Sequence, residues 1–336
     1  MSFLFPSSTI TLEAALRDLA GGSAKARALA AHALGDIDDP TARRRAAEAL
    51  HRALEDDRPE VRAEACASLG SLGDTTAIPL LVRRLDDGVT VVRQNAAIAL
   101  GSIGHPDGFE PLAEALREGP ADLRFQAATS LVEIDAKRAY GPIVTSLDDR
   151  DPQVVAAAAL SLGAIGDRQA LPHLLRQIDH LNDSTRFDVA YALSELGDAS
   201  GRRILLSAIA DADRAWDAVT ALATLGDADG LASTLTMKKV APEPTVLAAG
   251  SLLVLRSDDP PAQRVLVAAL GARKVHVRGL AVEQLAKVGG DWAVIPLEKL
   301  ARSGKGGELL EPIALALRAI EERRSRSRGD RIEQDP

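Results

Sequence analysis

The sequence predicts an all-α protein, a right-handed α/α superhelix or solenoid built from about ten helical hairpins. Three observations lead to this prediction. A short phrase recurs along the chain at a nearly constant spacing. Apolar residues make up 46% of the 336 residues and aromatic residues only 3%, which suits closely packed helices with small side chains. Alternating β-branched and aromatic residues, which would indicate strands, are almost absent.

The recurring phrase is Leu-Gly-x-Leu/Ile-Gly-Asp, and it is clearest in Leu69–Asp74 and Leu162–Asp167. Ten copies, some of them weaker, begin with an anchor leucine at positions 34, 69, 100, 131, 162, 193, 222, 252, 285 and 317. Successive anchors lie 29 to 35 residues apart. A period of this size is typical of helix pairs that stack in a solenoid.

Each part of the phrase has a role at the end of a helix. Upstream of one anchor, Val92, Ala96, Leu100 and Ile103 share a helix face. The closing glycine is expected to adopt the left-handed conformation that terminates a helix, at Gly73, Gly104, Gly166, Gly197 and Gly226. A following aspartate suits a turn or the next N-cap. A second apolar helix then begins, with a proline near its first turn at Pro79, Pro111, Pro142, Pro172 and Pro296.

An arginine recurs seven residues before the anchor, at Arg27, Arg62, Arg93, Arg124, Arg186 and Arg278. One interpretation is a basic ladder that binds phosphate. The other is that each arginine pairs with the acidic turn just before it, such as Asp57 with Arg62 or Asp87 with Arg93. Because solenoids repeat one stabilising contact in every unit, the structural interpretation is preferred.

The pattern Asp-x-x-x-Val-Arg…Ala-Leu-Gly-x-Ile-Gly-Asp resembles the HEAT repeats of the phycobilin-lyase type, within the HEAT/armadillo-like solenoids. The resemblance covers residues 10 to 320 and is strongest between 60 and 230. It implies an α/α superhelix whose second helices line the concave side. It implies little about function, because the family includes scaffolds, regulatory adaptors, bilin lyases and DNA-repair enzymes.

The expected organisation is one HEAT-repeat solenoid over residues 1–320 and a disordered, arginine-rich tail at 321–336. Residues 1–9 are expected to cap the first helix, since terminal repeats need atypical covers. Pro242 and Pro244 predict a kink at 236–245.

The net charge of −8 is unevenly distributed. Residues 236–305 carry 11 Lys/Arg against 6 Asp/Glu, whereas residues 1–235 carry 23 against 35. This distribution argues against a uniform nucleic-acid groove. The single cysteine, Cys66, lies in an alanine-rich helix and is expected to be buried and inert. No signal peptide or membrane span is predicted, so the expected location is the cytoplasm.

The candidate binding surface lies at non-core positions of the second helices, where rings stand beside acids in the middle of the stack. This is the composition of an interface hot spot. The candidate partner-binding residues are Asn95, Phe125, Gln126, Phe187, Asp188, Tyr191, Glu195, Trp216 and Asp217. Their acidic character favours a basic segment of a protein as the ligand. The alternative is that some of the rings fill space between helices that small alanines leave open.

The sequence contains no recognisable catalytic or metal-binding constellation. The six histidines are scattered over different repeats, and neither a phosphate-binding loop nor a nucleophile elbow is present. We therefore expect no metal, no cofactor and no enzymatic activity. The predicted function is a scaffold or adaptor that binds a protein partner through its concave face, with self-association through the chain ends as an alternative.

Two further hypotheses follow from the resemblance. A bilin lyase or isomerase-like subunit would bind an open-chain tetrapyrrole, with Tyr191, Trp216 and Asp217 as candidate contacts. A HEAT-type DNA glycosylase would need a basic groove and a Trp/Asp pocket. Trp216 and Asp217 superficially offer that pair, but the acidic balance of residues 1–235 opposes DNA wrapping.

Overall fold

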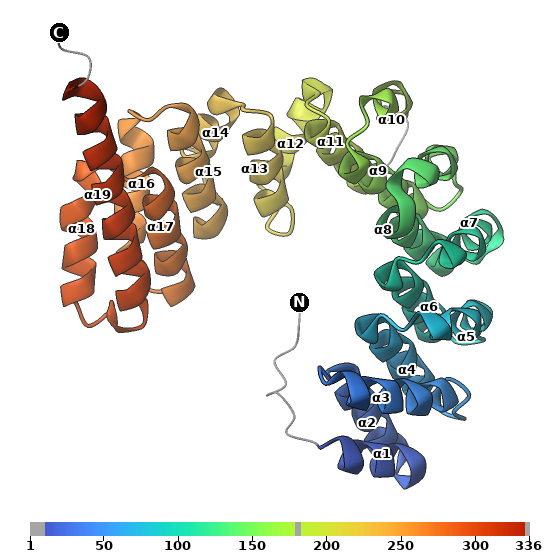
Figure 1. Ribbon diagram of the computed structural model, residues 1–336. Helices are drawn as coiled ribbons and strands as arrows, with labels where there is room; N and C mark the ends of the chain where they lie inside the picture. Colours follow the sequence, from blue (N-terminus) through green and yellow to red (C-terminus); the bar gives the residue numbers. More distant parts are fainter. Residues whose placement is uncertain (1–10, 179–182, 333–336) are drawn as a thin grey trace. The chain divides into compact units, whose positions relative to one another are not determined.

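The computed structural model describes residues 11–178 and 183–332 (Figure 1). Within these ranges the chain consists of α-helices, short 3-10 turns and loops, without a strand, which confirms the all-α prediction. The expected N-terminal cap at residues 1–9 lies outside the described residues. The chain divides into two compact units, Met1–Asp188 (unit 1) and Val189–Pro336 (unit 2). In the part of the chain that the structure describes, no helix combines the length and apolar character needed to cross a membrane.

The helices form hairpins, and every anchor leucine lies on the second helix of its hairpin. In unit 1 the second helices pack on one another in chain order (Figure 1). They are α2 (Ala24–Gly35), α4 (Pro59–Leu72), α6 (Thr90–Ile103), the first half of α8 (Ala121–Ser146) and α9 (Pro152–Ile165). The first helices are α1 (Leu12–Gly21), α3 (Pro40–Ala53), α5 (Ile78–Arg84), α7 (Phe109–Glu118), the second half of α8 and α10 (Leu171–Gln177). The boundary between the units falls inside α11 (Asp183–Glu195).

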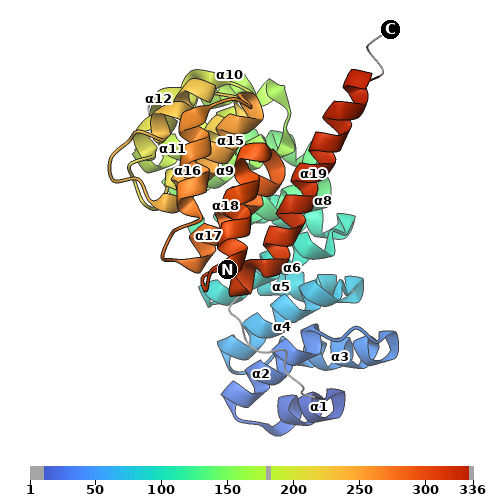
Figure 2. The ribbon, with the colours of Figure 1, turned by 90° about the vertical axis from the view of Figure 1, so that its left-hand side faces the viewer.

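Unit 2 repeats the same arrangement (Figure 2). Its second helices α13, α15, α17 and α19 again pack in order, each against the next. The helices after α11 are α12 (Arg202–Ala208), α13 (Ala215–Thr224), α14 (Ala228–Thr234), α15 (Pro242–Leu255), α16 (Pro260–Ala269), α17 (Val275–Val288), α18 (Asp291–Arg302) and α19 (Leu310–Ile332). Together with unit 1 they complete the ten predicted hairpins.

The anchor leucines form the core of the stack. The nine anchors from Leu34 to Leu285 are almost completely inaccessible to solvent. The tenth, Leu317, is only half-buried, whereas Ile313, Ala316 and Ile320 are buried in its place. These three residues recur at helical spacing on one face of α19. The register predicted for the last repeat was therefore wrong.

The five glycines predicted to end helices are the five glycines with positive φ in the described residues, with values between 65° and 74°. At the first of them, the Gly73 amide donates to the Gly70 carbonyl and the Asp74 amide donates to the Leu69 carbonyl, which satisfies carbonyls that the helix end leaves free. The Asp74 side chain then accepts from the Thr76 amide and begins the next hairpin. The prediction from the repeat phrase is confirmed.

Where the phrase lacks its glycine, two helices run together in α8. The repeat phrase there closes with Asp135 and has no glycine before it. Within α8, Asp135 is the residue with non-helical dihedral angles (φ −158°, ψ 95°). Its carboxylate accepts a hydrogen bond from the Arg138 amide at 3.0 Å, as an N-cap does. A single extended residue thus separates the fourth and fifth hairpins.

Two expected irregularities take a different form in unit 2. Pro242 and Pro244 lie in the first turn of α15, where proline is tolerated, so they begin a helix and do not break one. The tail expected to be disordered from residue 321 is helical through Ile332, because α19 continues. Arg323 anchors this extension by donating to the carbonyls at the end of α17 (Ala286, Leu285 and Gly289). Residues 333–336 lie outside the described part.

Candidate functional site

The recurring arginines of the first four repeats, Arg27, Arg62, Arg93 and Arg124, each join their repeat to the next. Arg62 donates through Nε and Nη2 to both carboxylate oxygens of Asp87, at 2.8 Å each. Its third nitrogen, Nη1, donates to the Asp56 carbonyl in the turn of its own repeat. Arg124 makes the same bidentate contact with Asp149, at 2.7 and 2.6 Å, and also donates to the Gly119 carbonyl. We call this contact the arginine staple.

The preference for a structural role is therefore supported, but the predicted partners were wrong. The preceding turn supplies a backbone carbonyl, and the carboxylate comes from the turn of the following repeat. Arg93 accordingly pairs with Asp122 and not with Asp87, whose carboxylate belongs to Arg62. Because these guanidinium groups are largely buried and bound to carboxylates, they do not form a free ladder for phosphate.

The staple also changes the acidity of its aspartates. The Arg62 guanidinium holds the pKa of Asp87 below its ordinary value, chiefly by hydrogen bonding, and Arg124 does the same for the pKa of Asp149. These carboxylates therefore stay ionised and act as part of the stack, so the acidic turns of unit 1 are in part structural.

Three of the candidate binding residues lie on neighbouring second helices of unit 1. Phe125 is 37% exposed on α8, and Gln126 beside it is half-buried. The Gln126 side-chain amide donates to the hydroxyl of Thr129 at 3.0 Å. Asn95, on α6, occupies the same repeat position as Gln126 and is also half-buried. The structure thus presents one exposed ring flanked by amides on this part of unit 1.

Phe187 corrects the expectation of a row of exposed rings. It stands at the same repeat position as Phe125, yet only 6% of it is accessible. This ring is therefore buried, which agrees with the interpretation that some of the rings fill space between helices. Asp188, the next residue and the last of unit 1, is half-buried.

The remaining four candidates lie in unit 2, on α11 and α13. Trp216 is 42% exposed, and Glu195 and Asp217 are exposed. Tyr191, on α11, is half-buried. Its burial is the main reason that its pKa is raised, and the negative charges of Glu195 and Asp217 raise the pKa further. The structure thus places Tyr191 within electrostatic range of Glu195 and Asp217, and the exposed Trp216 directly precedes Asp217 on α13.

Neither Cys66 nor the histidines within the described residues form a reactive site. Burial raises the pKa of the Cys66 thiol to about 12, which confirms the expected inert side chain. His32 and His276 each contact one glutamate of a neighbouring second helix, at 2.6 and 2.7 Å. Among the described residues, no group of three His, Cys, Asp or Glu side chains could hold a metal ion.

An apolar groove that the sequence did not lead us to expect lies on the first-helix face of unit 2, between α16 and α18. It has a volume of about 670 Å³, and Val267, Leu270, Ile295, Pro296 and Leu300 contribute to its lining. Ile295 and Lys299 stand in α18 at the positions of Glu110 and Glu114 in α7. A comparison of first helices, repeat against repeat, would have found this substitution of an apolar and a basic residue for two acids.

The repeats define a class of protein. The model of the HEAT repeats matches residues 11–101, 47–132, 87–157, 109–194 and 142–226, which together cover more than half of the chain. The chain therefore belongs to the HEAT-repeat family. HEAT and armadillo repeats generally form scaffolds for protein interactions. A search of curated proteins finds no match.

Solved structures extend this likeness to most of the chain. The structure of yeast importin-β (Kap95p) matches 95% of this chain and 51% of its own length, with 12% identity and a TM-score of 0.57. A chain in a homology model of the full-length AP-3 complex matches 82% of this chain over 56% of its own length, with 15% identity and a TM-score of 0.54. The CpcE–CpcF complex of phycocyanin lyase from Nostoc matches 79% of this chain and 97% of its own, with 23% identity and a TM-score of 0.41. At these identities the likeness to importin-β and to the AP-3 chain shows the fold alone.

Proposed function

We propose that this protein is a non-enzymatic scaffold or adaptor that binds a segment of a partner protein on the face lined by its second helices. The observation that carries the proposal is the cluster of Tyr191, Glu195, Trp216 and Asp217 in unit 2. Aromatic rings that remain accessible beside charged groups are the usual centres of protein interfaces, because they bury a large area at low entropic cost.

The chemistry of the cluster favours a basic segment. Trp216 offers an exposed ring face, and cations are attracted to such faces, most strongly to tryptophan. Asp217 and Glu195 are exposed carboxylates that would pair with a second cationic group. An arginine-containing segment would satisfy both requirements. In unit 1, Phe125 with Asn95 and Gln126 provides a second contact region on the second-helix face.

The experiment compares three forms of the full-length protein in affinity purification from the native lysate, followed by mass spectrometry. The site variant combines Trp216→Ala with Asp217→Arg. The control variant, Glu298→Ala, removes a half-buried acid on a first helix, α18, where it pairs only with Arg302 of the same helix among the ion pairs of the described residues. A partner that the wild type and the control retain is then purified, and its dissociation constant is measured.

We expect the site variant to bind that partner at least about tenfold more weakly, since truncating an interface tryptophan generally costs 2 kcal/mol or more. If both variants bind it as the wild type does, the second-helix cluster is not the binding site. An absorbance scan of the same eluates tests the tetrapyrrole hypothesis, because a retained chromophore would favour the lyase-like function over the adaptor.

A further inference from the structure

The groove between α16 and α18 has counterparts elsewhere in the stack. In unit 1 an equivalent groove lies between α5 and α7, and Val82, Leu85, Pro111 and Glu114 contribute to its lining. The corresponding residues in unit 2 are Val267, Leu270, Pro296 and Lys299, and each follows its counterpart by the same number of residues. The two grooves are thus the same feature of the repeat, built twice with different side chains.

The charge at the rim is reversed between the two grooves. The α5–α7 groove has Asp86, Glu114 and Glu118 among its lining residues. At the corresponding positions the α16–α18 groove has Gly271, Lys299 and Ser303, and Lys305 completes its lining. The repeat geometry therefore permits either sign of charge at the rim of the groove. In the α16–α18 groove the floor is apolar and the rim is basic.

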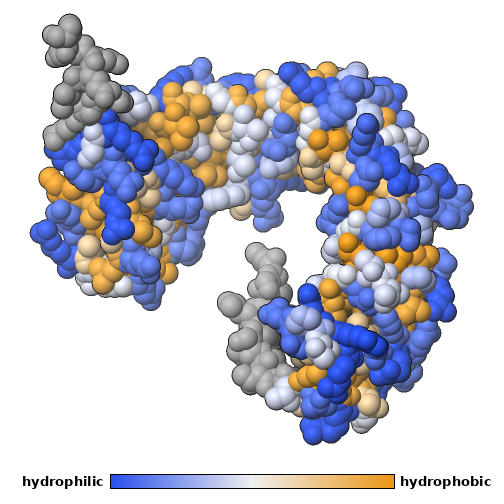
Figure 3. Space-filling model, in the orientation of Figure 1, coloured by the Kyte–Doolittle hydropathy of each residue, from blue (hydrophilic) through white to orange (hydrophobic). Residues whose placement is uncertain are grey.

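Ile295 marks the same groove as an interface. It is 75% exposed, the highest exposure among the large apolar residues of the described chain. The equivalent position in α7 is Glu110, which is exposed and pairs with Arg138 at 2.7 Å. Apolar side chains gather over this part of unit 2, at the left of Figure 3. Because a charged residue occupies the equivalent position in α7, this position does not need an apolar side chain for core packing. An exposed isoleucine there is expected where a binding partner covers the surface.

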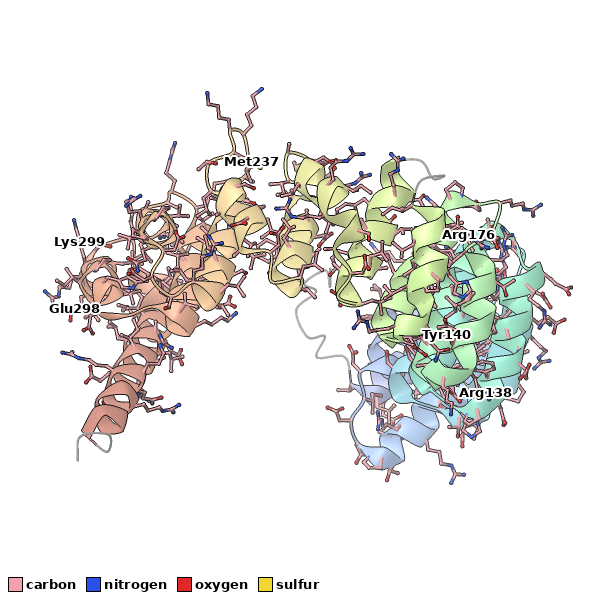
Figure 4. The ribbon with its side chains drawn as sticks, turned by 90° about the horizontal axis from the view of Figure 1, so that it is seen from above. Arg138, Tyr140, Arg176, Met237, Glu298 and Lys299 are labelled. Carbon is pink, nitrogen blue, oxygen red and sulfur yellow. The ribbon has the colours of Figure 1, made fainter. Side chains whose placement is uncertain are left out.

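The turns at the end of the groove add positive charge. The turn between α16 and α17 carries Arg273 and Lys274, and the turn between α18 and α19 carries Lys305; all three are exposed. Arg278 holds these turns side by side, because its guanidinium donates to the carbonyls of Ala272, Arg273 and Lys305. Figure 4 shows the Lys299 side chain projecting outward from α18 on the same unit.

The corresponding turns in unit 1 are acidic, for example Asp56–Asp57 and Asp148–Asp149. There the staple arginines meet carboxylates: Arg27 pairs with both Asp56 and Asp57, and Arg124 pairs with Asp149. In unit 2 the Arg278 guanidinium donates to backbone carbonyls of the turns, and these turns place the exposed Arg273 and Lys305 at the surface. Lys274 is also exposed and lies 3.6 Å from the Glu243 carboxylate. A cationic groove of this kind attracts and orients an anionic partner.

We propose that the groove between α16 and α18 binds an acidic amphipathic helix of a partner protein. Leucine-like side chains of that helix would pack against Leu270, Ile295 and Leu300, and its Asp or Glu side chains would pair with Lys299 and Lys305. A helix is the expected ligand because α16 and α18 form two neighbouring ridges with a groove between them. The side chains of a third helix, spaced at i and i+4, can pack into such a groove. This surface is separate from the second-helix cluster and has the opposite charge preference.

The test uses a display library of helical peptides as the probe. Peptides are selected on the full-length wild-type protein and counter-selected on an Ile295→Glu/Lys299→Glu variant. Both substituted side chains are exposed, so the variant is expected to fold, and far-UV circular dichroism checks this. The selected peptides are expected to carry leucine, isoleucine or phenylalanine at i and i+4 together with Asp or Glu. The proposal is overturned if no peptide distinguishes the two proteins or if the selected peptides are basic.

A selected peptide is then labelled, and its dissociation constant is measured by fluorescence anisotropy against single variants. Ile295→Glu and Lys299→Glu should each weaken binding at least about tenfold. Glu114→Lys, the matched control in the α5–α7 groove, and Trp216→Ala, in the second-helix cluster, should leave binding unchanged. Loss of binding in Trp216→Ala would place the peptide in the second-helix cluster and refute the groove. Equal binding by Ile295→Glu, with competition by heparin, would show a site for polyanions and also refute it.

Discussion

Replacing Arg124 by alanine removes the contact that joins the fourth repeat to the fifth. In the wild type the guanidinium makes two hydrogen bonds to Asp149, at 2.7 and 2.6 Å, and one to the Gly119 carbonyl, at 2.9 Å. Only 5% of the Arg124 side chain and 13% of the Asp149 side chain are exposed. The substitution therefore leaves a carboxylate with little access to water and without its counter-ion.

Breaking a buried ion pair from one side costs about 3–5 kcal/mol. Because Asp149 also accepts a hydrogen bond from the Asp151 amide, we expect the lower end, about 3 kcal/mol. Urea unfolding, followed by far-UV circular dichroism, measures this loss as a lower midpoint. The matched control is Arg176→Ala, since Arg176 pairs with Asp148 in the same turn but both side chains are more than half exposed. Such a pair is worth less than about 1 kcal/mol, so equal losses in the two variants would refute the staple.

The same pair gives a pH dependence with a defined sign. The folded-state pKa of Asp149 is lowered, so the pair stabilises the protein above the pKa of an unfolded aspartate, about 3.9. Its contribution is lost as the pH falls from that value through the folded-state pKa. The difference in stability between wild type and Arg124→Ala should therefore be constant at neutral pH and shrink below about pH 4. A difference that grows on acidification would contradict this assignment.

Three further predictions concern single residues outside the candidate sites. Gly166→Ala should lower the free energy of unfolding by about 1–2 kcal/mol because φ at this residue is +74°. Gly141 lies in a helix with equally open space for a Cβ, so Gly141→Ala should raise the free energy of unfolding by about 0.5–1 kcal/mol. Urea titrations compare the two variants. Cys66, with its pKa raised to about 12 by burial, should react with a thiol reagent at pH 8 only after denaturation, and fast labelling of the native protein would contradict its burial. Arg323→Ala should lower the melting temperature, because it removes donors from three carbonyls at the end of α17, while Arg326→Ala, at an exposed position, should not.

The helix-terminating features of the fold were predictable because each depends on neighbouring residues. A glycine after an apolar helix adopts a left-handed conformation for local steric reasons, and Gly73 and Gly166 do so. The partner of Arg93 depends instead on how one hairpin packs against the next. Asp87 and Asp122 are both acidic residues near a turn, and only the stacking decides that Arg93 meets Asp122.

The candidate sites show the same limit. Phe125 and Phe187 share a repeat position, so the periodicity assigns them the same direction from the helix axis. Their exposures are 37% and 6%, because burial also depends on the side chains that the adjoining helices place around each ring. Ile295 was not predicted for a different reason: it lies on a first helix, where a single apolar residue is not distinguishable from the core pattern until its exposure is known.

Because of the arginine staple, several junctions between repeats of unit 1 use the same pair of residue types at the same repeat positions. Each joint consists of an arginine seven residues before one anchor and an aspartate in the following turn, as in Arg62 with Asp87 and Arg124 with Asp149. A duplicated repeat would bring both halves of the joint with it, so the two new junctions would each find a complementary partner without any further substitution. The length of this unit could therefore change by whole repeats while the side chains on its accessible faces diverge independently.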